Sequence, residues 1–143
     1  MATTSSPADL AVRLRLAVTR TARRLRREAG GDLSPSLSAA LATIERHGPL
    51  APSELAAREG IQRPAATRIV DRLAEVGLVA RTPDPADRRS CRVAATPEGE
   101  ELIAALRTRK DAFLADRLAG LDPADRRTLE RAAELLEELL EAR

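Results

Sequence analysis

Aromatic, cysteine and histidine residues are nearly missing from this chain, and their scarcity excludes several classes of protein. Trp and Tyr are absent, and Phe, Cys and His occur once each. One cysteine cannot form an internal disulfide, and with one histidine it cannot supply the three or four nitrogen and sulfur ligands of a zinc site. Proteins that bind single-stranded nucleic acid stack bases on aromatic side chains, so that class is disfavoured too. We therefore expect no metal and no cofactor.

Membrane, secretion and catalytic signals are also missing. No apolar run approaches the roughly 18 residues that a membrane span needs, and residues 1–9 lack the basic-then-apolar pattern of a signal peptide. No serine or cysteine stands in a plausible arrangement with histidine and a carboxylate, and no glycine-rich phosphate loop is present. The 143 residues suffice for one domain. The expectation is a cytoplasmic protein without membrane contact that is not an enzyme.

The charges are balanced in number but uneven in kind and in position. There are 24 basic and 22 acidic residues, and Lys110 is the only lysine. Arginine is suited to bidentate contacts with phosphates and base edges, although GC-rich coding produces the same preference. The first two thirds of the chain carry net positive charge and the last third net negative charge. This asymmetry fits a molecule with one face toward a polyanion and another toward protein or solvent.

Proline and glycine divide the chain into helices. Proline is favoured at the first helical position and glycine just past the last one, and six of the nine prolines stand where a helix can begin. Good N-cap residues precede four of these prolines, namely Ser6, Ser34, Thr96 and Asp122. The intervals predict helices over residues 7–29, 35–47, 52–59, 64–76, 97–119 and 123–142. The protein should therefore be mainly helical.

The one long interval without helix signals predicts a β-hairpin. Residues 79–82 and 90–94 are short strand candidates, and the charged, turn-rich stretch 83–89 lies between them. The two short helices before it, at 52–59 and 64–76, are separated by a short turn with a glycine, which is the spacing of a helix-turn-helix. A hairpin in this place is a wing. An ordinary corner between two helices gives the same pattern.

Periodicity separates the two faces of the helix at 64–76. The inward residues, at i, i+3, i+4 and i+7, are Ala66, Ile69, Val70 and Leu73. The outward residues are Ala65, Thr67, Arg68, Asp71 and Arg72. Small outward residues let a helix approach the floor of a major groove, and Arg68 can reach a guanine edge or a phosphate.

The first and last helices carry apolar stripes that we expect to be half buried. The first stripe consists of Leu10, Leu14, Val18 and Leu25, and the last of Leu129, Ala132, Ala133, Leu136 and Leu140. With the helix at 97–119 they offer more apolar surface than a lone chain of this size can cover. We therefore expect the three long helices to pack together and against a second copy, as a homodimer.

The sequence over these elements resembles the MarR family of bacterial transcriptional regulators. The resemblance is carried by T-R-I-V-D-R-L at 67–73, G-L-V at 77–79, D-P-A-D-R-R at 84–89 and T-P-E-G at 96–99, and it covers essentially the whole chain. It implies a winged helix-turn-helix dimer whose recognition helices enter major grooves of a pseudo-palindromic operator. In the family's Asp-x-Arg wing motif, matched here by Asp87 and Arg89, the arginine enters the minor groove and the aspartate orients it.

The expected fold is mainly α with a small β-hairpin wing, a winged helix-turn-helix with long terminal dimerisation helices. Within a single domain at 1–143, the DNA-binding lobe is expected at 35–96 and the dimerisation helices at 7–29 and 97–142. The recognition-helix residues expected at DNA are Arg63, Pro64, Ala65, Thr67, Arg68 and Arg72. The wing residues expected at DNA are Asp87, Arg88 and Arg89.

The expected function is that of a ligand-responsive repressor of transcription. The effector in this family is often a small aromatic acid, but the chain offers too few aromatic markers to locate a pocket. The alternative is a winged-helix module that contacts protein, or that packs DNA without a specific operator or an effector. Two features depart from the family pattern: Ala95 stands where leucine is common, and the first helix lacks the cysteine that peroxide-sensing members share.

Three further features have plain interpretations beside functional ones. His47 follows a helix end, where a cation complements the helix dipole. Cys91 is expected to be a small strand residue, although the neighbouring Arg89 and Arg92 could activate its thiol. The basic run at 20–27 either clamps DNA or pairs with the acidic last helix.

Overall fold

Six helices and one hairpin make up residues 4–141, the part of the chain that the computed structural model describes. The elements are α1 (Pro7–Ala29), α2 (Pro35–His47), α3 (Pro52–Glu59), α4 (Arg63–Glu75), β1 (Val79–Pro83), β2 (Cys91–Ala95), α5 (Pro97–Ala119) and α6 (Pro123–Glu141). The expectation of a mainly helical chain with one β-hairpin is confirmed, and each described boundary lies within one residue of its prediction. The predicted last residue of the final helix, Ala142, lies outside the described residues. No helix in the described range is long and apolar enough to cross a membrane.

Side-chain caps fix the starts of three helices where the sequence predicted them. The hydroxyl of Ser6 accepts a hydrogen bond from the N–H of Asp9 at 3.1 Å, and Ser34 caps α2 in the same way. Thr96 caps α5 by accepting from the N–H of Gly99 at 3.2 Å. The helices α3 and α4 have a proline in the first turn but no side-chain cap, as their sequences imply.

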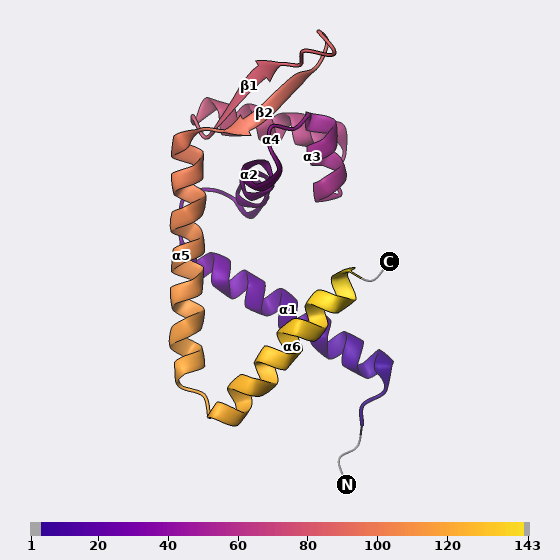
Figure 1. Cartoon of the computed structure of the whole chain (residues 1–143), viewed down its shortest axis with the longest axis vertical. Helices are drawn as coiled ribbons and strands as arrows, with labels where there is room; N and C mark the ends of the chain where they lie inside the picture. The colour runs from indigo at the N-terminus through magenta and orange to yellow at the C-terminus, as the bar shows by residue number, and fades with distance from the viewer. Residues whose placement is uncertain (1–3, 142–143) are drawn as a thin grey trace.

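Different helices form the two ends of the molecule. Helices α2, α3 and α4 and the hairpin form one end, and α5 runs from there to the other end, where α1 and α6 lie (Figure 1).

An ion pair between Arg107 and Glu45, 2.8 Å apart, joins α5 to α2. The hydrogen bond from Arg107 lowers the pKa of Glu45. The pair therefore contributes to stability above the ordinary carboxyl range and is lost as the pH falls through that lowered pKa.

A single apolar cluster holds the helix-turn-helix and the wing together. Its largest fully buried members are Leu41, Ile44, Leu50, Leu55, Val70, Leu73 and Val93, drawn from α2, α3, α4, β2 and the α2–α3 loop. On α4 the predicted inward residues Ala66, Val70 and Leu73 are buried and Ile69 is half-buried. The periodicity of α4 therefore identified its core face correctly.

The hairpin is antiparallel and carries one additional backbone pairing. Its register runs from Val79 opposite Ala95 to Pro83 opposite Cys91. Leu50, from the loop between α2 and α3, pairs with Val93, and the two backbone hydrogen bonds measure 3.0 and 2.8 Å. Ala95 is half-buried against the core. Alanine in place of the family's usual leucine is therefore compatible with strand pairing.

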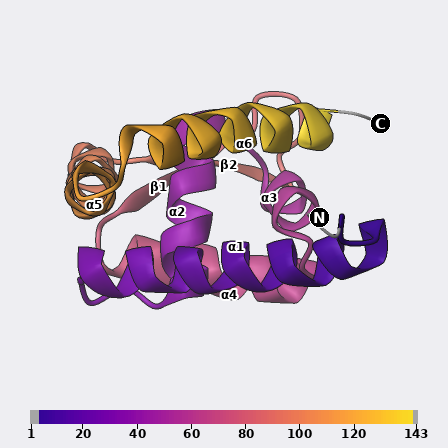
Figure 2. The same ribbon diagram turned by 90° about the horizontal axis from the view of Figure 1, so that it is seen from below.

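The terminal helices depart from the prediction that both apolar stripes are half buried. Helix α1 packs on α5, but α6 buries no residue, and α1 and α6 cross in Figure 1 while lying apart in Figure 2. Of the predicted stripes, only Leu25, Ala132 and Leu136 are half-buried. Val18 is 51% exposed and Leu140 is 87% exposed. The prediction that all three long helices pack together is therefore wrong for α6 within one chain, because no element among residues 4–141 covers its apolar face.

Candidate nucleic-acid interface

A tight turn sets the angle between α3 and α4. Gly60 has φ of 64° and ψ of 36°, a left-handed conformation that glycine adopts without a steric penalty. The N–H of Ile61 donates to the carbonyl of Ala56 at 3.0 Å, which closes the end of α3. Gln62 then begins α4 without a side-chain cap. The first N–H groups of α4 are consequently free of side-chain caps, and such groups bind phosphate readily.

The outward face of α4 is exposed along most of its length. The exposed predicted residues are Arg63, Pro64, Thr67, Arg68 and Arg72, whereas Ala65 is half-buried. The full exposure expected of Ala65 is therefore not met, because its position borders the core face. The hydroxyl of Thr67 donates to the carbonyl of Arg63 at 3.1 Å.

The arginines of this face differ in their partners. Arg72 is paired with Glu75 at 3.1 Å, one helical turn further on. Arg68 has no carboxylate within ion-pair distance in the described part of the chain. Arg68 can therefore meet a base edge or a phosphate without first breaking an ion pair, while Arg72 must leave Glu75 to do so.

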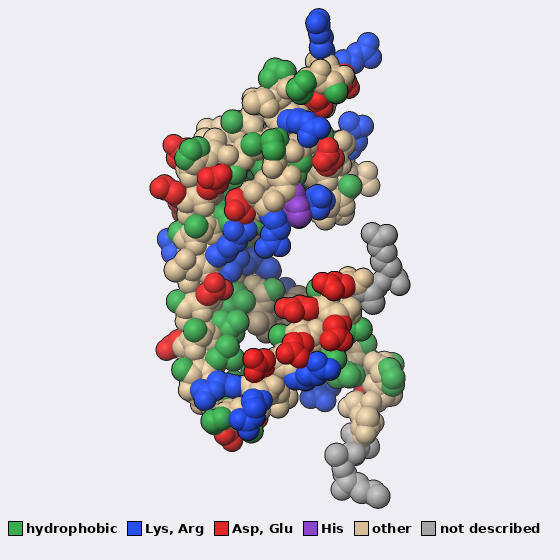
Figure 3. Space-filling model, in the orientation of Figure 1, with side chains coloured by type: hydrophobic (Ala, Val, Ile, Leu, Met, Phe, Trp, Pro, Cys, Tyr) green, Lys and Arg blue, Asp and Glu red, His purple; other side chains and the backbone are tan. Residues whose placement is uncertain are grey.

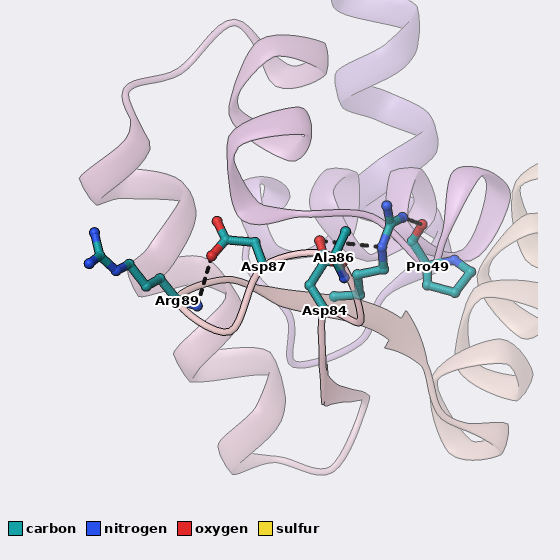
Figure 4. A network of polar contacts seen from close by, with 6 residues as sticks. Pro49, Asp84, Ala86, Asp87 and Arg89 are labelled. Atoms are coloured by element: carbon teal, nitrogen blue, oxygen red, sulfur yellow. Dashed lines mark hydrogen bonds and ion pairs between the residues drawn. The ribbon is translucent and has the colours of Figure 1, made fainter.

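The loop between β1 and β2 presents its arginines to solvent. Arg88 and Arg89 are exposed, and the Asp87 carboxylate accepts a hydrogen bond from the backbone N–H of Arg89 at 3.0 Å. Figure 4 shows the side chain of Arg89 extending away from that carboxylate. Among the described residues no carboxylate pairs with the Arg89 guanidinium. Asp87 therefore orders the backbone at Arg89 and does not pair with its guanidinium, and the orienting role that the resemblance implies stays a prediction.

A second group of polar contacts fixes the base of the wing. Asp84 accepts from the N–H of Ala86 at 2.9 Å and pairs with Arg92 at 3.7 Å. Arg92 also donates to the carbonyl of Pro49 at 3.4 Å, so it joins the hairpin to the α2–α3 loop (Figure 4).

A further ion pair joins the hairpin to α4, between Arg81 and Asp71. Sequence reasoning missed this ion pair and the link from Arg92 to Pro49. The alternation of side chains along a strand assigns Arg81 and Arg92 to faces of the hairpin, but it does not identify their partners.

The exposed charges are sorted along the molecule. Figure 3 shows basic side chains extending from the tip of the wing and acidic side chains spread over α6. Further basic side chains gather near the middle, where α1 meets α5 (Figure 3). Helix α1 has seven arginines and two acidic residues, and α6 has six acidic residues and three arginines. The wing and α4 lie at the same end of the molecule (Figure 1), and Arg63, Arg68 and Arg72 of α4 are exposed there.

The remaining candidates occupy plain structural positions. His47 is the exposed last residue of α2, and Cys91 is half-buried and packs against the core from β2. In the basic run at 20–27, Arg24 pairs with Glu28 at 2.7 Å and lies over the ring of Phe113. No ion pair within residues 4–141 joins this run to α6. Within those residues no group of His, Cys, Asp and Glu is arranged to hold a metal ion.

Comparison with known proteins places this geometry in a family. The sequence model of the MarR family matches residues 33–91. An uncharacterized HTH-type transcriptional regulator of Mycobacterium bovis is 40% identical over 132 residues, which cover 92% of each chain. A solved structure of a Pseudomonas aeruginosa protein has a TM-score of 0.86 and 34% identity, covering 99% of this chain and 100% of the other.

The fold also matches a protein solved with nucleic acid. Streptococcus pneumoniae FabT, solved in complex with DNA, has a TM-score of 0.72 and 16% identity, covering 92% of this chain and 97% of the other. At that identity the likeness concerns the fold alone. The identity and coverage of the Mycobacterium bovis relative are far higher, and the family model matches the helix-turn-helix and the start of the wing. The chain belongs to the MarR family of winged helix-turn-helix transcriptional regulators, which are not enzymes.

Proposed function

We propose that the protein is a ligand-responsive repressor that binds a pseudo-palindromic operator as a homodimer in the cytoplasm. The observation that carries the proposal is the exposed Arg68 on α4, which makes no ion pair among the described residues. Helix α4 lies at the same end of the molecule as the wing, whose loop carries Arg88 and Arg89 (Figure 1). Helix α4, through the six predicted residues from Arg63 to Arg72, enters the major groove. The wing, through Asp87, Arg88 and Arg89, reaches the adjacent minor groove. A dimer seated on its operator excludes other proteins from that DNA and so represses.

The DNA-binding lobe comprises residues 35–96, and residues 7–29 and 97–142 form the dimerisation lobe. Support for the dimer comes from uncovered apolar side chains at both ends of the chain, with Leu10 46% exposed and Leu139 67% exposed. Monomeric proteins rarely leave such contiguous faces open.

The dimer can be tested by sedimentation at micromolar concentration. We expect a mass about twice the 15.4 kDa of one chain. A mass of one chain at concentrations where operator DNA is bound would contradict the dimer, and with it the pseudo-palindromic operator.

Regulation follows from the distance between the two recognition helices. Half-sites one DNA turn apart are about 34 Å from centre to centre, so a few ångströms of change spoil the register. A coupling of about 1 to 3 kcal/mol between effector and DNA suffices to switch binding. The effector acts in the cleft between the helical lobe and the winged lobe. Protection of the DNA flanking the gene, with and without phenolic acids and oxidants, tests both operator and effector.

A duplex titration with competitor DNA separates this function from the alternative module that contacts protein or packs DNA. A specific regulator binds its operator about 10³-fold or more tighter than unrelated duplex, whereas an architectural binder does not. The titration is carried out at a fixed salt concentration, because phosphate contacts make every affinity salt-dependent. Equal binding to operator and competitor would exclude the repressor.

Replacing Arg68 with alanine tests the recognition helix. We expect the affinity for a mapped operator to fall by about 1 to 3 kcal/mol, partly in a sequence-dependent way, because Arg68 reaches a base edge or a phosphate. The mass and thermal unfolding should not change, since Arg68 is exposed and makes no ion pair within the described residues. Arg58→Ala on α3 is the matched control for loss of one exposed positive charge. Unchanged operator affinity for Arg68→Ala would remove α4 from the interface.

Cys91 is expected to be dispensable for regulation. It is half-buried on β2 opposite Pro83, and its contacts are those of a small strand residue. Cys91→Ser should keep operator affinity within about twofold and should keep the response to an effector. Gel-shift titrations with and without peroxide measure both. If peroxide releases the wild type and not Cys91→Ser, the thiol is a sensor and the strand-residue interpretation is wrong.

A further inference from the structure

A cavity of about 450 Å³ lies where the C-terminal half of α1 meets α2 and α5. Arg23, Arg26 and Arg27 line it from α1, and Lys110 lines it from α5. Arg26 and Lys110 also line an adjoining space of about 280 Å³. Both volumes are close to those of small-molecule sites in proteins.

The four cations of this cavity lack carboxylate partners within the described residues. Positions 23, 26 and 27 lie on one face of α1, where like charges three and four residues apart repel one another. No carboxylate within residues 4–141 pairs with any of the four, although Arg24 on the same helix pairs with Glu28. Lys110, the only lysine of the chain, is half-buried at this place. Repelling cations gathered around a concave site stabilise a bound anion.

The rest of the wall defines the body of the ligand. Leu33, Pro35 and Leu106 supply apolar surface to the same cavity as the cations. Neither an acidic residue nor an aromatic one lines the cavity. An acidic side chain would repel an anion, and aromatic faces are what select a flat aromatic ligand. The wall therefore suits a ligand with a charged head and an aliphatic body.

We propose that this cavity binds a small non-aromatic molecule whose head carries at least two negative charges and whose body is aliphatic. Two charges are indicated because one carboxylate poorly compensates the four cations that line the cavity. That this ligand regulates the protein rests on the proposed repressor function. The binding of the ligand can be measured without DNA.

The cavity adjoins the recognition helix through one short segment. Gly31 and Leu33, between α1 and α2, also line a second cavity of about 430 Å³. Arg72 of α4 and Val76 at the end of that helix line the second cavity from its other side. A ligand that moves the segment at 30–34 therefore acts on the base of α4. This gives the ligand a contiguous physical route to the DNA-binding helix.

The test is calorimetric titration of the full chain at pH 7.5 with five probes. Hexyl phosphate and hexylmalonate carry a dianionic head on a six-carbon body, and hexanoate carries one charge. Inorganic phosphate is the head alone, and salicylate is an aromatic monoanion. We expect at least one hexyl dianion to bind about 10-fold or more tighter than hexanoate, phosphate and salicylate. Which dianion binds better identifies phosphate or dicarboxylate as the head.

Variants locate the site. Arg26→Gln with Lys110→Gln should weaken the dianion about 10-fold or more, and Lys110→Gln alone should weaken it measurably if the double variant does not fold. Arg15→Gln removes the same charge from α1 outside the cavity and should bind as the wild type does.

Three results would overturn the proposal: hexanoate binding as tightly as both dianions, salicylate binding tightest, or Lys110→Gln binding unchanged. Dimer dissociation by the double variant would show that the cations meet the acidic α6 of a second copy instead, and would also overturn it. If the probes do not bind but the operator does, only the ligand proposal fails and the repressor function stands. If the wild type does not bind operator DNA when no probe is present, the repressor function itself is overturned.

Discussion

Gly99→Ala is expected to lower the free energy of unfolding by about 3 kcal/mol. A Cβ at this position would lie 2.1 Å from the carbonyl oxygen of Leu78 and 3.3 Å from a methyl carbon of Leu41. The carbonyl of Leu78 also accepts the N–H of Thr96 at 3.1 Å. The added carbon therefore meets backbone that cannot move without breaking the junction between the wing and α5. Urea unfolding at one protein concentration measures the loss.

Gly120→Ala is the matched control at the other end of the same helix. Gly120 has φ of −79° and ψ of −5°, and an added Cβ would lie 3.6 Å from the carbonyl oxygen of Arg117, an ordinary contact. Stability should stay level or rise by up to about 1 kcal/mol, because alanine has less freedom in the unfolded chain. Equal effects of Gly99→Ala and Gly120→Ala on stability would show that the first turn of α5 shifts to accommodate the added carbon without a loss of stability.

Gly99 also shows how far local sequence signals reach. The T-P-E-G motif predicted a helix start, because Thr is a good N-cap and Pro suits the first turn. The structure adds the reason for its glycine, which is the close approach of Leu78 from a segment about twenty positions earlier. Caps and prolines act within one turn of the chain, so they located every helix to within a residue. Contacts between distant segments leave no such local signal.

The same limit separates what was predicted of the interface from what was not. Periodicity found the buried and exposed faces of α4, since both follow from 3.6 residues per turn. It could not tell Arg68 from Arg72, because the ion pair of Arg72 with Glu75 depends on rotamers. The links from Arg81 to Asp71 and from Arg92 to Pro49 depend on how the hairpin folds back over the helices. The exposure of α6 was missed because an apolar stripe predicts burial without naming the surface that covers it.

Asp87→Ala is expected to lower operator affinity, whereas Asp87→Asn is expected to keep or raise it. Removing a negative charge beside DNA strengthens binding in simple Coulomb terms, because phosphates attract the remaining cations more strongly. Asp87, however, accepts the N–H of Arg89 at 3.0 Å and so orders the loop that presents that arginine. Alanine abolishes this hydrogen bond and leaves the loop to be ordered on binding, at about 1 to 2 kcal/mol per half-site. Asparagine keeps an acceptor oxygen for the same N–H and removes only the charge.

We therefore expect Asp87→Ala to weaken specific binding and Asp87→Asn to match or exceed the wild type. Arg89→Ala should weaken it more, by about 1.5 to 3 kcal/mol per half-site, and should reduce the salt dependence, because a charged contact is lost from each wing. The double variant should bind no worse than Arg89→Ala, since the aspartate acts through the arginine. Salt titrations of a mapped operator measure the affinities of the wild type and the four variants. Tighter binding by Asp87→Ala at physiological salt would show that charge outweighs loop order, and the aspartate would then oppose the wing arginine and not present it.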